Sequence, residues 1–233
     1  MSAAPGLFAR LKADAADAWW AYTTHPFVRA LGEGTLSPDA FRFYLAQDYL
    51  FLVQFARAYG LAVYKAPTLA AMRRAAAGLN GILGIELALH VRIVERWGMS
   101  GEELERTPEA RTTIAYSRFV LDAGNRGDLL DLMTGLAPCI IGYGEIGQAL
   151  AATAGGRAAD NPYREWIAEY AGDAYQQLTG DAEAELDRLA AEALTEARYP
   201  HLLALFEQAT RLEADFWQAG LDAIAGEAAD GRA

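Results

Sequence analysis

Apolar residues recur every three to four positions along nearly the whole chain, and no segment alternates convincingly between apolar and polar residues as a β-strand does. This pattern predicts an all-α fold. The chain has 233 residues, 53% of them hydrophobic, which is enough for one substantial core, and no change in composition marks a linker. We therefore expect a single-domain helical bundle over residues 1–222, followed by a disordered tail at residues 223–233, which are rich in Ala, Gly and Asp.

Capping residues and prolines predict where the helices begin and end. Ser37 is the expected N-cap of a long helix, Pro38 is its first residue, and Pro67 stops it after about residue 65. Ser100 and Glu103 have the spacing of a capping box, which predicts a short helix. Further helices are expected over about residues 6–23, 68–97, 107–122, 128–153, 163–170 and 181–195 and from residue 200 onward, with loops at 32–36 and 124–127.

Charge and cysteine content argue against several classes of partner. The net charge is −11 and the pI is near 4.7, whereas nucleic acids and anionic membranes attract clustered Lys and Arg. The N-terminus has acidic residues where a signal peptide has its apolar core, and no apolar run approaches the roughly 18 residues of a membrane span. One cysteine cannot form an internal disulfide, which fits a reducing compartment. We expect a cytoplasmic protein.

The segment from Leu136 to Gly147 holds the chain's single cysteine, Cys139, directly after Pro138. A proline within a helix removes one backbone hydrogen bond and favours a kink. Tyr143 lies four residues after Cys139, so the thiol and the phenol share one helix face. These features suggest the wall of a pocket, although a free cysteine is also a common small core residue.

Two carboxylates fall inside apolar helix stripes, where solvent exposure is not expected. Asp48 interrupts the stripe of the helix at 38–65, and Glu213 interrupts that of the last helix. A carboxylate facing a core costs free energy unless it is paired or hydrogen-bonded, so Asp48 is either bonded to a neighbouring tyrosine or backbone donor or directed at a ligand. Together with Cys139 they place three reactive groups inward on three helices, which favours an enzyme.

Several segments, taken in this order, resemble the TenA/thiaminase II family over nearly the whole chain. They are HPFVRALGEGTLSPDAFRFYLAQDYLFL (25–52), Tyr116, LAPCIIGYGEIG (136–147), NPYREWIAEY (161–170) and EADFW (213–217). The resemblance implies an all-α fold of the haem-oxygenase type, used without haem, and usually a homotetramer. It implies hydrolysis of the C–N bond at the C5 methylene of a 4-amino-2-methylpyrimidine. Aminomethyl pyrimidine would give hydroxymethyl pyrimidine and ammonia, and thiamin would give pyrimidine and thiazole.

The resemblance also assigns roles to the three inward groups. Cys139 matches the nucleophile, Glu213 the acid that protonates the pyrimidine and the leaving group, and Asp48 the carboxylate bonded to the substrate ring. The chemistry is consistent, because a thiolate is a strong nucleophile and a buried carboxyl can supply a proton near neutral pH. The reaction implies no metal and no organic cofactor.

The other matched positions line the site. Tyr143 and Tyr170 match hydroxyls there, and Tyr116 matches an aromatic wall. Phe51 is a departure, because many members have at this position a tyrosine thought to help activate the cysteine. Phenylalanine keeps the shape and the stacking face but lacks the hydroxyl, which bears on the rate and on the preferred leaving group.

Two other classes of function compete with this hypothesis. A pyrimidine- or thiamin-binding protein without turnover would not need Cys139. A metal-dependent oxidase on the same fold would use Glu86 and His90, whose spacing of four can place two ligands on one helix face. The chain has only two further histidines, His25 and His201, whereas a dinuclear site in a helical bundle usually has a second Glu/His set. An ordinary hydrogen-bonded pair is therefore the favoured interpretation of Glu86 and His90.

Overall fold

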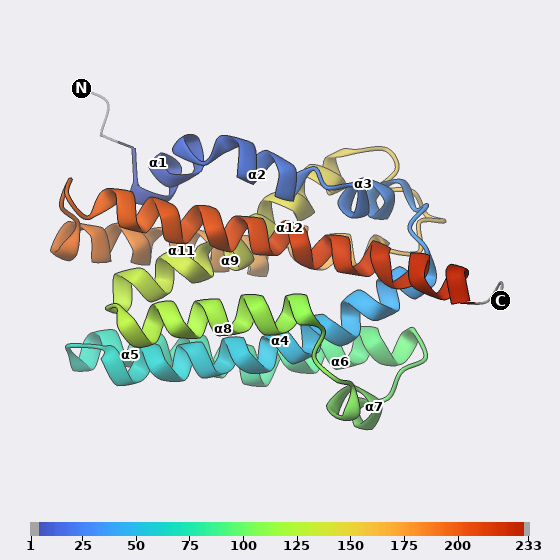
Figure 1. The fold of residues 1–233 in the computed structure, drawn as a ribbon, viewed down its shortest axis with the longest axis horizontal. Coiled ribbons are helices and arrows are strands. Elements are labelled where there is room, and N and C mark those ends of the chain that lie inside the picture. The colour runs from blue at the N-terminus through green and yellow to red at the C-terminus, as the bar shows by residue number, and fades with distance from the viewer. Residues whose placement is uncertain (1–4, 231–233) are drawn as a thin grey trace. The chain divides into compact units, whose positions relative to one another are not determined.

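The computed structural model describes residues 5–230, without the side chains of residues 85, 86, 89 and 226–230 (Figure 1). Its regular secondary structure within this range is helical, with no strand, so the predicted all-α fold is confirmed. The chain divides into two compact units, each built from two separate segments. The first unit comprises Met1–Leu36 and Met133–Ala214, and the second comprises Ser37–Leu132 and Asp215–Ala233. The single domain at 1–222 and the disordered tail at 223–233 stay predictions; the last helix continues to Asp230, and residues 231–233 lie outside the described residues.

The first unit has the N-terminal helices and most of the C-terminal ones. Its helices are α1 (Leu7–Asp14), α2 (Ala16–Thr23), α3 (Pro26–Glu33), most of α9 (Leu129–Ala152), α10 (Arg164–Ala171), α11 (Asp173–Ala193) and the first part of α12 (Tyr199–Asp230). Helix α11 packs against α1 and α10. The Asn161 side chain ties α3 to the segment after α9, because its Nδ2 donates to the carbonyl oxygens of Leu31, Gly32 and Gly155 over 3.1–3.2 Å.

The second unit is organised around one long helix. It contains α4 (Pro38–Lys65), α5 (Leu69–Gly81), the π-helix η1 (Ile82–Glu86), α6 (Leu87–Arg96), α7 (Gly101–Arg106), α8 (Arg111–Arg126) and the last part of α12. Helix α4 packs against α5, α6 and α8, and Figure 1 shows α4, α5 and α8 running alongside one another. The apolar stripe expected on α4 is buried, including Phe41, Tyr44, Leu52 and Phe55.

Local capping chemistry explains the boundaries that the sequence predicts correctly. The Ser37 hydroxyl accepts from the backbone N–H of Asp39 at the start of α4, and the helix ends at Lys65, two residues before Pro67. Both hydrogen bonds of the capping box between Ser100 and Glu103 are present at α7.

Several predicted boundaries are wrong, and the loop expected at 124–127 is mostly helical, because α8 continues to Arg126. The helix expected over 6–23 is broken at Ala15, whose backbone has φ −104° and ψ 28°. The helix expected over 68–97 is interrupted by η1, and the acidic helix expected from residue 181 begins earlier, at Asp173. The helix expected from residue 107 begins at Arg111. The Gln47 amide explains the last difference, because it donates to the carbonyl of Pro108 and accepts from the N–H of Ala110, which holds this segment outside the helix.

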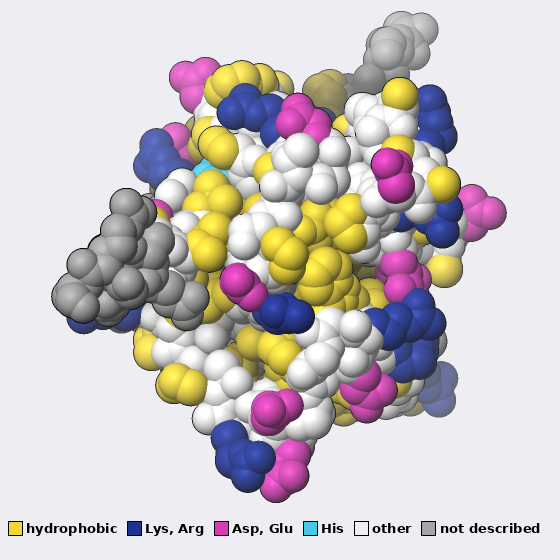
Figure 2. Space-filling model, turned by 90° about the vertical axis from the view of Figure 1, so that its right-hand side faces the viewer, with side chains coloured by type: hydrophobic (Ala, Val, Ile, Leu, Met, Phe, Trp, Pro, Cys, Tyr) yellow, Lys and Arg dark blue, Asp and Glu magenta, His cyan; other side chains and the backbone are white. Residues whose placement is uncertain are grey.

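Helix α9 is long and apolar enough to cross a membrane when judged by length and composition alone, so the expectation that no segment approaches a span is wrong in that respect. However, 83% of its most apolar 18-residue window is buried inside the protein, as in the core helix of a soluble protein. The criterion is therefore weak evidence for a membrane. On the face shown in Figure 2, Lys and Arg side chains are interspersed with Asp and Glu.

Candidate active site

Cys139 lies half-buried in α9, directly after Pro138. On the neighbouring face of this turn, the buried hydroxyl of Tyr22 donates to the carbonyl oxygen of Pro138 over 3.3 Å. The glycine at position 142 permits this contact, because a Cβ there would overlap the Tyr22 ring. The turn that carries the thiol is thus held by a phenol from α2.

An aromatic cluster follows one turn later on α9. The Tyr143 ring lies 5.1 Å from the Tyr170 ring and 6.0 Å from the Trp166 ring, both on α10. The close approach of the two helices depends on Gly147, because a Cβ there would lie 2.6 Å from the backbone carbonyl carbon of Tyr170. The predicted pair of Tyr143 and Tyr170 is therefore brought together. Such rings offer flat faces to a planar heterocycle and hydroxyls to its polar edge.

Glu213 is buried in the apolar stripe of α12, with 1% of its surface exposed. Its neighbour Thr210 is fully buried and donates its hydroxyl to the carbonyl of Phe206 over 2.8 Å, within the same helix. A carboxyl group at this depth is stable only when it is hydrogen-bonded or protonated. Glu213 is therefore buried where a carboxyl group needs a partner or a proton, in the same unit as Cys139.

Asp48 is buried in the second unit and contacts two titratable side chains. The Tyr44 hydroxyl, one turn earlier on α4, donates to Asp48 Oδ2 over 3.2 Å. His90 Nδ1, from α6, lies 3.4 Å from the same oxygen, and His90 Nε2 lies 2.7 Å from the carbonyl oxygen of Leu45. Both Asp48 and His90 are 5% exposed.

Burial shifts the two groups in opposite directions. It raises the pKa of Asp48 from 3.8 to about 7, against a smaller lowering effect of the Tyr44 hydrogen bond. It lowers the pKa of His90 from 6.5 to about 4, against the raising effect of the bond to the Leu45 carbonyl. Both shifts favour the neutral form of each group, so Asp48 can hold a proton near pH 7 while His90 does not.

A stacked pair of rings lies one turn further along α4. Phe51 and Tyr116 have ring centroids 4.6 Å apart at an interplanar angle of 21°, and both are buried. Gln47 sets the position of α8 for this contact, because its Oε1 also accepts from the Thr113 hydroxyl, one turn before Tyr116. Tyr116, the expected aromatic wall, is therefore stacked on Phe51, the residue at the position where the resemblance implies a tyrosine.

The predicted site residues are divided between the two units. Cys139, Tyr143, Tyr170 and Glu213 belong to the first, and Asp48, Phe51 and Tyr116 belong to the second. That Asp48, Cys139 and Glu213 line one cavity stays a prediction.

Sequence reasoning allowed a neighbouring tyrosine as the partner of Asp48 but did not name Tyr44 for it, and it singled out neither Tyr22 nor a contact of His90 with Asp48. The spacing of four between Tyr44 and Asp48 is a signal that could have found that contact. The contacts of Tyr22 and His90 join helices that are distant in the chain, so no local pattern reports them.

The metal-site alternative rests on a side chain that lies outside the described ones, that of Glu86. Among the residues whose side chains are described, no three His, Cys, Asp or Glu residues form a group that could hold a metal ion. The two ring nitrogens of His90 face the Leu45 carbonyl and the Asp48 carboxyl. The contacts of this histidine are therefore those of a hydrogen-bonded residue.

Comparison with known protein families matches residues 13–223 to the TENA/THI-4/PQQC family. The aminopyrimidine aminohydrolase of Halalkalibacterium halodurans is 38% identical over 200 residues, which are 85% of this chain and 88% of that protein. The aminopyrimidine aminohydrolase of Bacillus subtilis is 30% identical over 185 residues, which are 79% of this chain and 77% of that protein.

Solved structures show the same fold. A TenA family transcription regulator from Silicibacter sp. TM1040 superposes with a TM-score of 0.87 at 44% identity, over 92% of this chain and 96% of that one. A domain of unknown function with a heme oxygenase-like fold from Shewanella denitrificans gives a TM-score of 0.71 at 12% identity, over 94% of this chain and 93% of that one. The second likeness shows the fold alone, and it confirms the predicted haem-oxygenase type.

Proposed function

Because the chain belongs to the TENA/THI-4/PQQC family, we propose that it is a thiamin-salvage hydrolase acting on 4-amino-2-methylpyrimidines substituted at the C5 methylene. The predicted resemblance to the TenA/thiaminase II family is confirmed by the family match. The predicted enzyme class is supported by relatives that carry the name aminopyrimidine aminohydrolase. In the proposed reaction water replaces the amine of aminomethyl pyrimidine, which yields hydroxymethyl pyrimidine and ammonia. Thiamin is cleaved in the same way to pyrimidine and thiazole.

The observation that carries this proposal is the position of Cys139. The chain has one cysteine, and it lies in a helix turn held by Tyr22, one turn before a tyrosine that packs against Tyr170. A displacement at an aminomethyl carbon needs a strong nucleophile, and a thiolate is the strongest that an amino-acid side chain supplies near neutral pH.

In the proposed mechanism each of the three predicted groups has one task. The Cys139 thiolate forms a C–S bond to the methylene carbon while the C–N bond breaks and its electron pair stays on the nitrogen. Glu213 supplies one proton, which first activates the ring and ends on the leaving nitrogen as ammonia departs. Asp48 hydrogen-bonds the ring and fixes its orientation. Water then displaces the thiolate, with Glu213 accepting the proton of that water.

Two other functions are less well supported. A pyrimidine-binding protein without turnover gives no reason for the thiol at position 139. One solved relative is called a transcription regulator, but a net charge of −11 on this chain and the mixed charges visible in Figure 2 argue against contacts to a DNA backbone.

Replacement Cys139→Ser tests the proposal. The serine hydroxyl is far less ionised near pH 7 than a thiol, so we expect ammonia release from aminomethyl pyrimidine to fall on the order of a hundredfold or more. Binding of hydroxymethyl pyrimidine, measured by calorimetry, should be retained. Near-normal turnover would indicate direct attack by water. Binding without any turnover of aminomethyl pyrimidine or thiamin by the unmodified protein would indicate the non-catalytic function.

A further inference from the structure

His90 reaches from α6 to two successive groups of α4. Its Nε2 lies 2.7 Å from the carbonyl oxygen of Leu45, and its Nδ1 lies 3.4 Å from Asp48 Oδ2. A carbonyl oxygen only accepts hydrogen bonds, so Nε2 carries a proton. In the neutral ring Nδ1 is then an acceptor, and it faces an oxygen of the carboxyl group.

This geometry ties the protonation of the two groups together. A neutral His90 accepts from Asp48 only if the carboxyl is protonated on Oδ2. An ionised Asp48 is favourable only if Nδ1 also carries a proton, since otherwise a lone pair and a carboxylate would face each other in a buried place. The pair therefore holds one proton, on the oxygen or on the nitrogen.

Few other charges act on the pair within the described residues. On α4 itself the titratable neighbours are Tyr44, bonded to Oδ2, and Tyr49, whose ring lies 6.4 Å from the His90 ring. Asp39 and Arg42, nearer the start of α4, are exposed and pair with each other. Thr113 and Tyr116 of α8 and Phe216 and Trp217 of α12 contact α4 and are uncharged. The charged Glu109, directly before α8, accepts from Gln54, six residues after Asp48, and is paired with Arg118.

The π-helix accounts for the direction of His90. Ala71, Ala75 and Ile82 form the buried face of α5 and the start of η1. A π turn takes up about one residue more than an α turn, which rotates all later side chains by about 100° around the axis. In an uninterrupted α-helix the residue seven positions after Ile82, residue 89, would lie on this buried face. The extra residue of the π turn shifts the count by one, so His90 lies on this face instead.

Resting on the proposed function, we propose that His90 is a positioning residue that receives the proton of Asp48 when the aminopyrimidine ring binds. In this step the O–H bond at Asp48 Oδ2 breaks, its electron pair stays on the oxygen, and the lone pair of Nδ1 forms the new N–H bond. The Leu45 carbonyl stabilises the resulting imidazolium through Nε2. Asp48 Oδ1, which accepts no hydrogen bond from the described residues, then presents a full negative charge to a ring that becomes positive as it is protonated.

This transfer provides a buried carboxylate only when the positively charged ring is present to stabilise it. A carboxylate stabilises a protonated ring better than a carboxylic acid does, but a lone buried carboxylate costs free energy in the empty protein. A proton acceptor directly behind Asp48 lets the carboxyl be neutral before binding and ionised afterwards. No proton has to leave for the solvent.

Nitrogen NMR of histidine-labelled protein tests the step directly. The chain has three histidines, so the signals of His90 are identified by their loss in His90→Asn. At pH 6 without ligand we expect His90 to be neutral with its proton on Nε2. Addition of hydroxymethyl pyrimidine should protonate both ring nitrogens of His90. A neutral His90 in the saturated complex would overturn the proposal.

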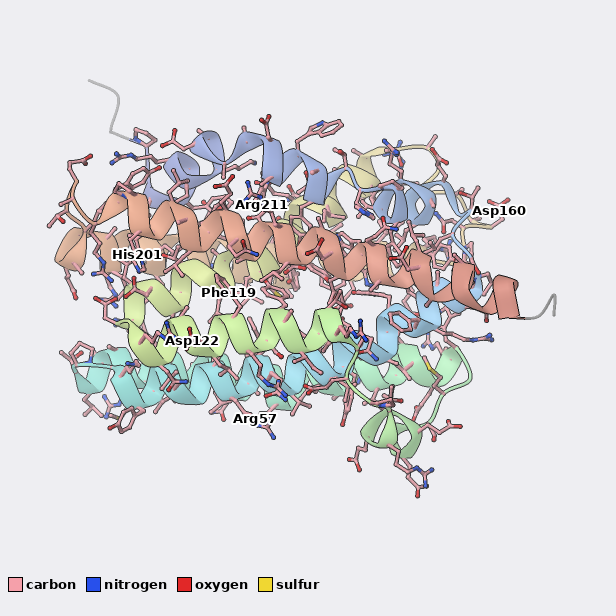
Figure 3. All side chains as sticks on the ribbon, viewed as in Figure 1. Arg57, Phe119, Asp122, Asp160, His201 and Arg211 are labelled. Atoms are coloured by element: carbon pink, nitrogen blue, oxygen red, sulfur yellow. The ribbon has the colours of Figure 1, made fainter. Side chains whose placement is uncertain are left out.

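A proton count provides a second, independent readout. Binding of hydroxymethyl pyrimidine is measured by calorimetry at pH 6 in buffers of different ionisation enthalpy, which gives the protons released per ligand bound. Asn at position 90 keeps an oxygen acceptor but cannot be protonated, so we expect His90→Asn to release up to about one proton more than the unmodified protein. His201→Asn, at an exposed residue near the start of α12 (Figure 3), should leave the count unchanged.

The outcomes separate this proposal from the function on which it rests. No binding and no turnover of any aminopyrimidine by the unmodified protein would overturn the proposed function. Normal binding with equal proton counts in all three proteins would overturn the transfer to His90 alone. If the His90→Asn protein does not bind hydroxymethyl pyrimidine, the NMR measurement on the unmodified protein decides whether His90 receives the proton.

Discussion

At the scale of single residues, burial shifts the pKa values of Asp48 and His90 so that the neutral form of each side chain is favoured. An aspartate in water is ionised above pH 4, but Asp48 has a pKa of about 7, and the pKa of His90 is about 4. Each shift reflects the cost of a charge away from water. The folded protein therefore depends on pH through a pair of residues that the proposed function also uses.

Replacement Asp48→Asn should make unfolding less sensitive to pH. The pKa of Asp48 is higher in the folded protein than its ordinary value, so its stabilising contribution is complete below about pH 4 and is lost as the pH rises to about 7. The Asn side chain does not titrate in this range, so the variant does not lose stability in this way. Relative to the unmodified protein, the variant should therefore gain up to about 4 kcal/mol between pH 4 and pH 8.

Urea unfolding of both proteins at pH 4 and pH 8 measures this gain. Effects of Asn on packing and hydrogen bonding are the same at both pH values and cancel in the comparison. A stability difference between the two proteins that does not change with pH would contradict the assignment of a raised pKa to Asp48.

At the scale of helices, the close contact of α9 and α10 depends on one missing side chain. We expect Gly147→Ala to destabilise the protein and to lower the rate of pyrimidine hydrolysis, because the added Cβ meets the backbone of Tyr170 and Ala171 and α10 must move. Thermal unfolding and steady-state kinetics measure the two effects.

The matched control for this substitution is Gly180→Ala on α11, where an added Cβ meets nothing within 4 Å and the residue is exposed. Alanine there should stabilise the helix by up to about 1 kcal/mol. Equal effects of the two substitutions would mean that the contact between α9 and α10 does not depend on Gly147.

Helix boundaries could be predicted from the sequence where the signal is local. Ser37 and Pro67 delimit α4 through backbone geometry that neighbouring residues determine, and the same is true of the capping box at Ser100. The start of α8 depends on the side chain of Gln47, far away in the chain, and η1 has no sequence signal of this kind. Periodicity located Asp48 and Glu213 on buried faces, but the partners of Asp48 come from tertiary packing.

At the scale of the whole molecule, the family resemblance leads us to propose a cytoplasmic homotetramer. The second unit exposes large apolar side chains at Tyr64, Leu69 and Leu83, which are 83%, 61% and 53% accessible. A contiguous apolar patch on a surface typically marks a contact with another molecule, and these three side chains are the candidates for such a contact in the second unit. We expect them to be covered by another copy of the chain.

Native mass spectrometry of Leu69→Glu tests this expectation. A charge at a buried subunit contact is costly, so the variant should shift from tetramer towards smaller species. The same change at Leu178, which is 37% accessible on α11 in the first unit, serves as the control and should leave the tetramer intact. A monomeric unmodified protein would refute the tetramer, and a tetramer unaffected by Leu69→Glu would refute the contact.

The first unit is built from two segments that lie far apart in the chain, and this affects its folding during synthesis. Its opening segment ends at Leu36, and its remaining segment begins about a hundred residues later, at Met133. At typical speeds of translation this gap takes roughly 5–20 s to synthesise. During that interval Leu7, Phe8 and Leu11 have left the ribosome without the helices that later bury them. We therefore expect newborn chains to be more vulnerable to aggregation than finished ones, so that chaperone supply should affect the yield of this protein.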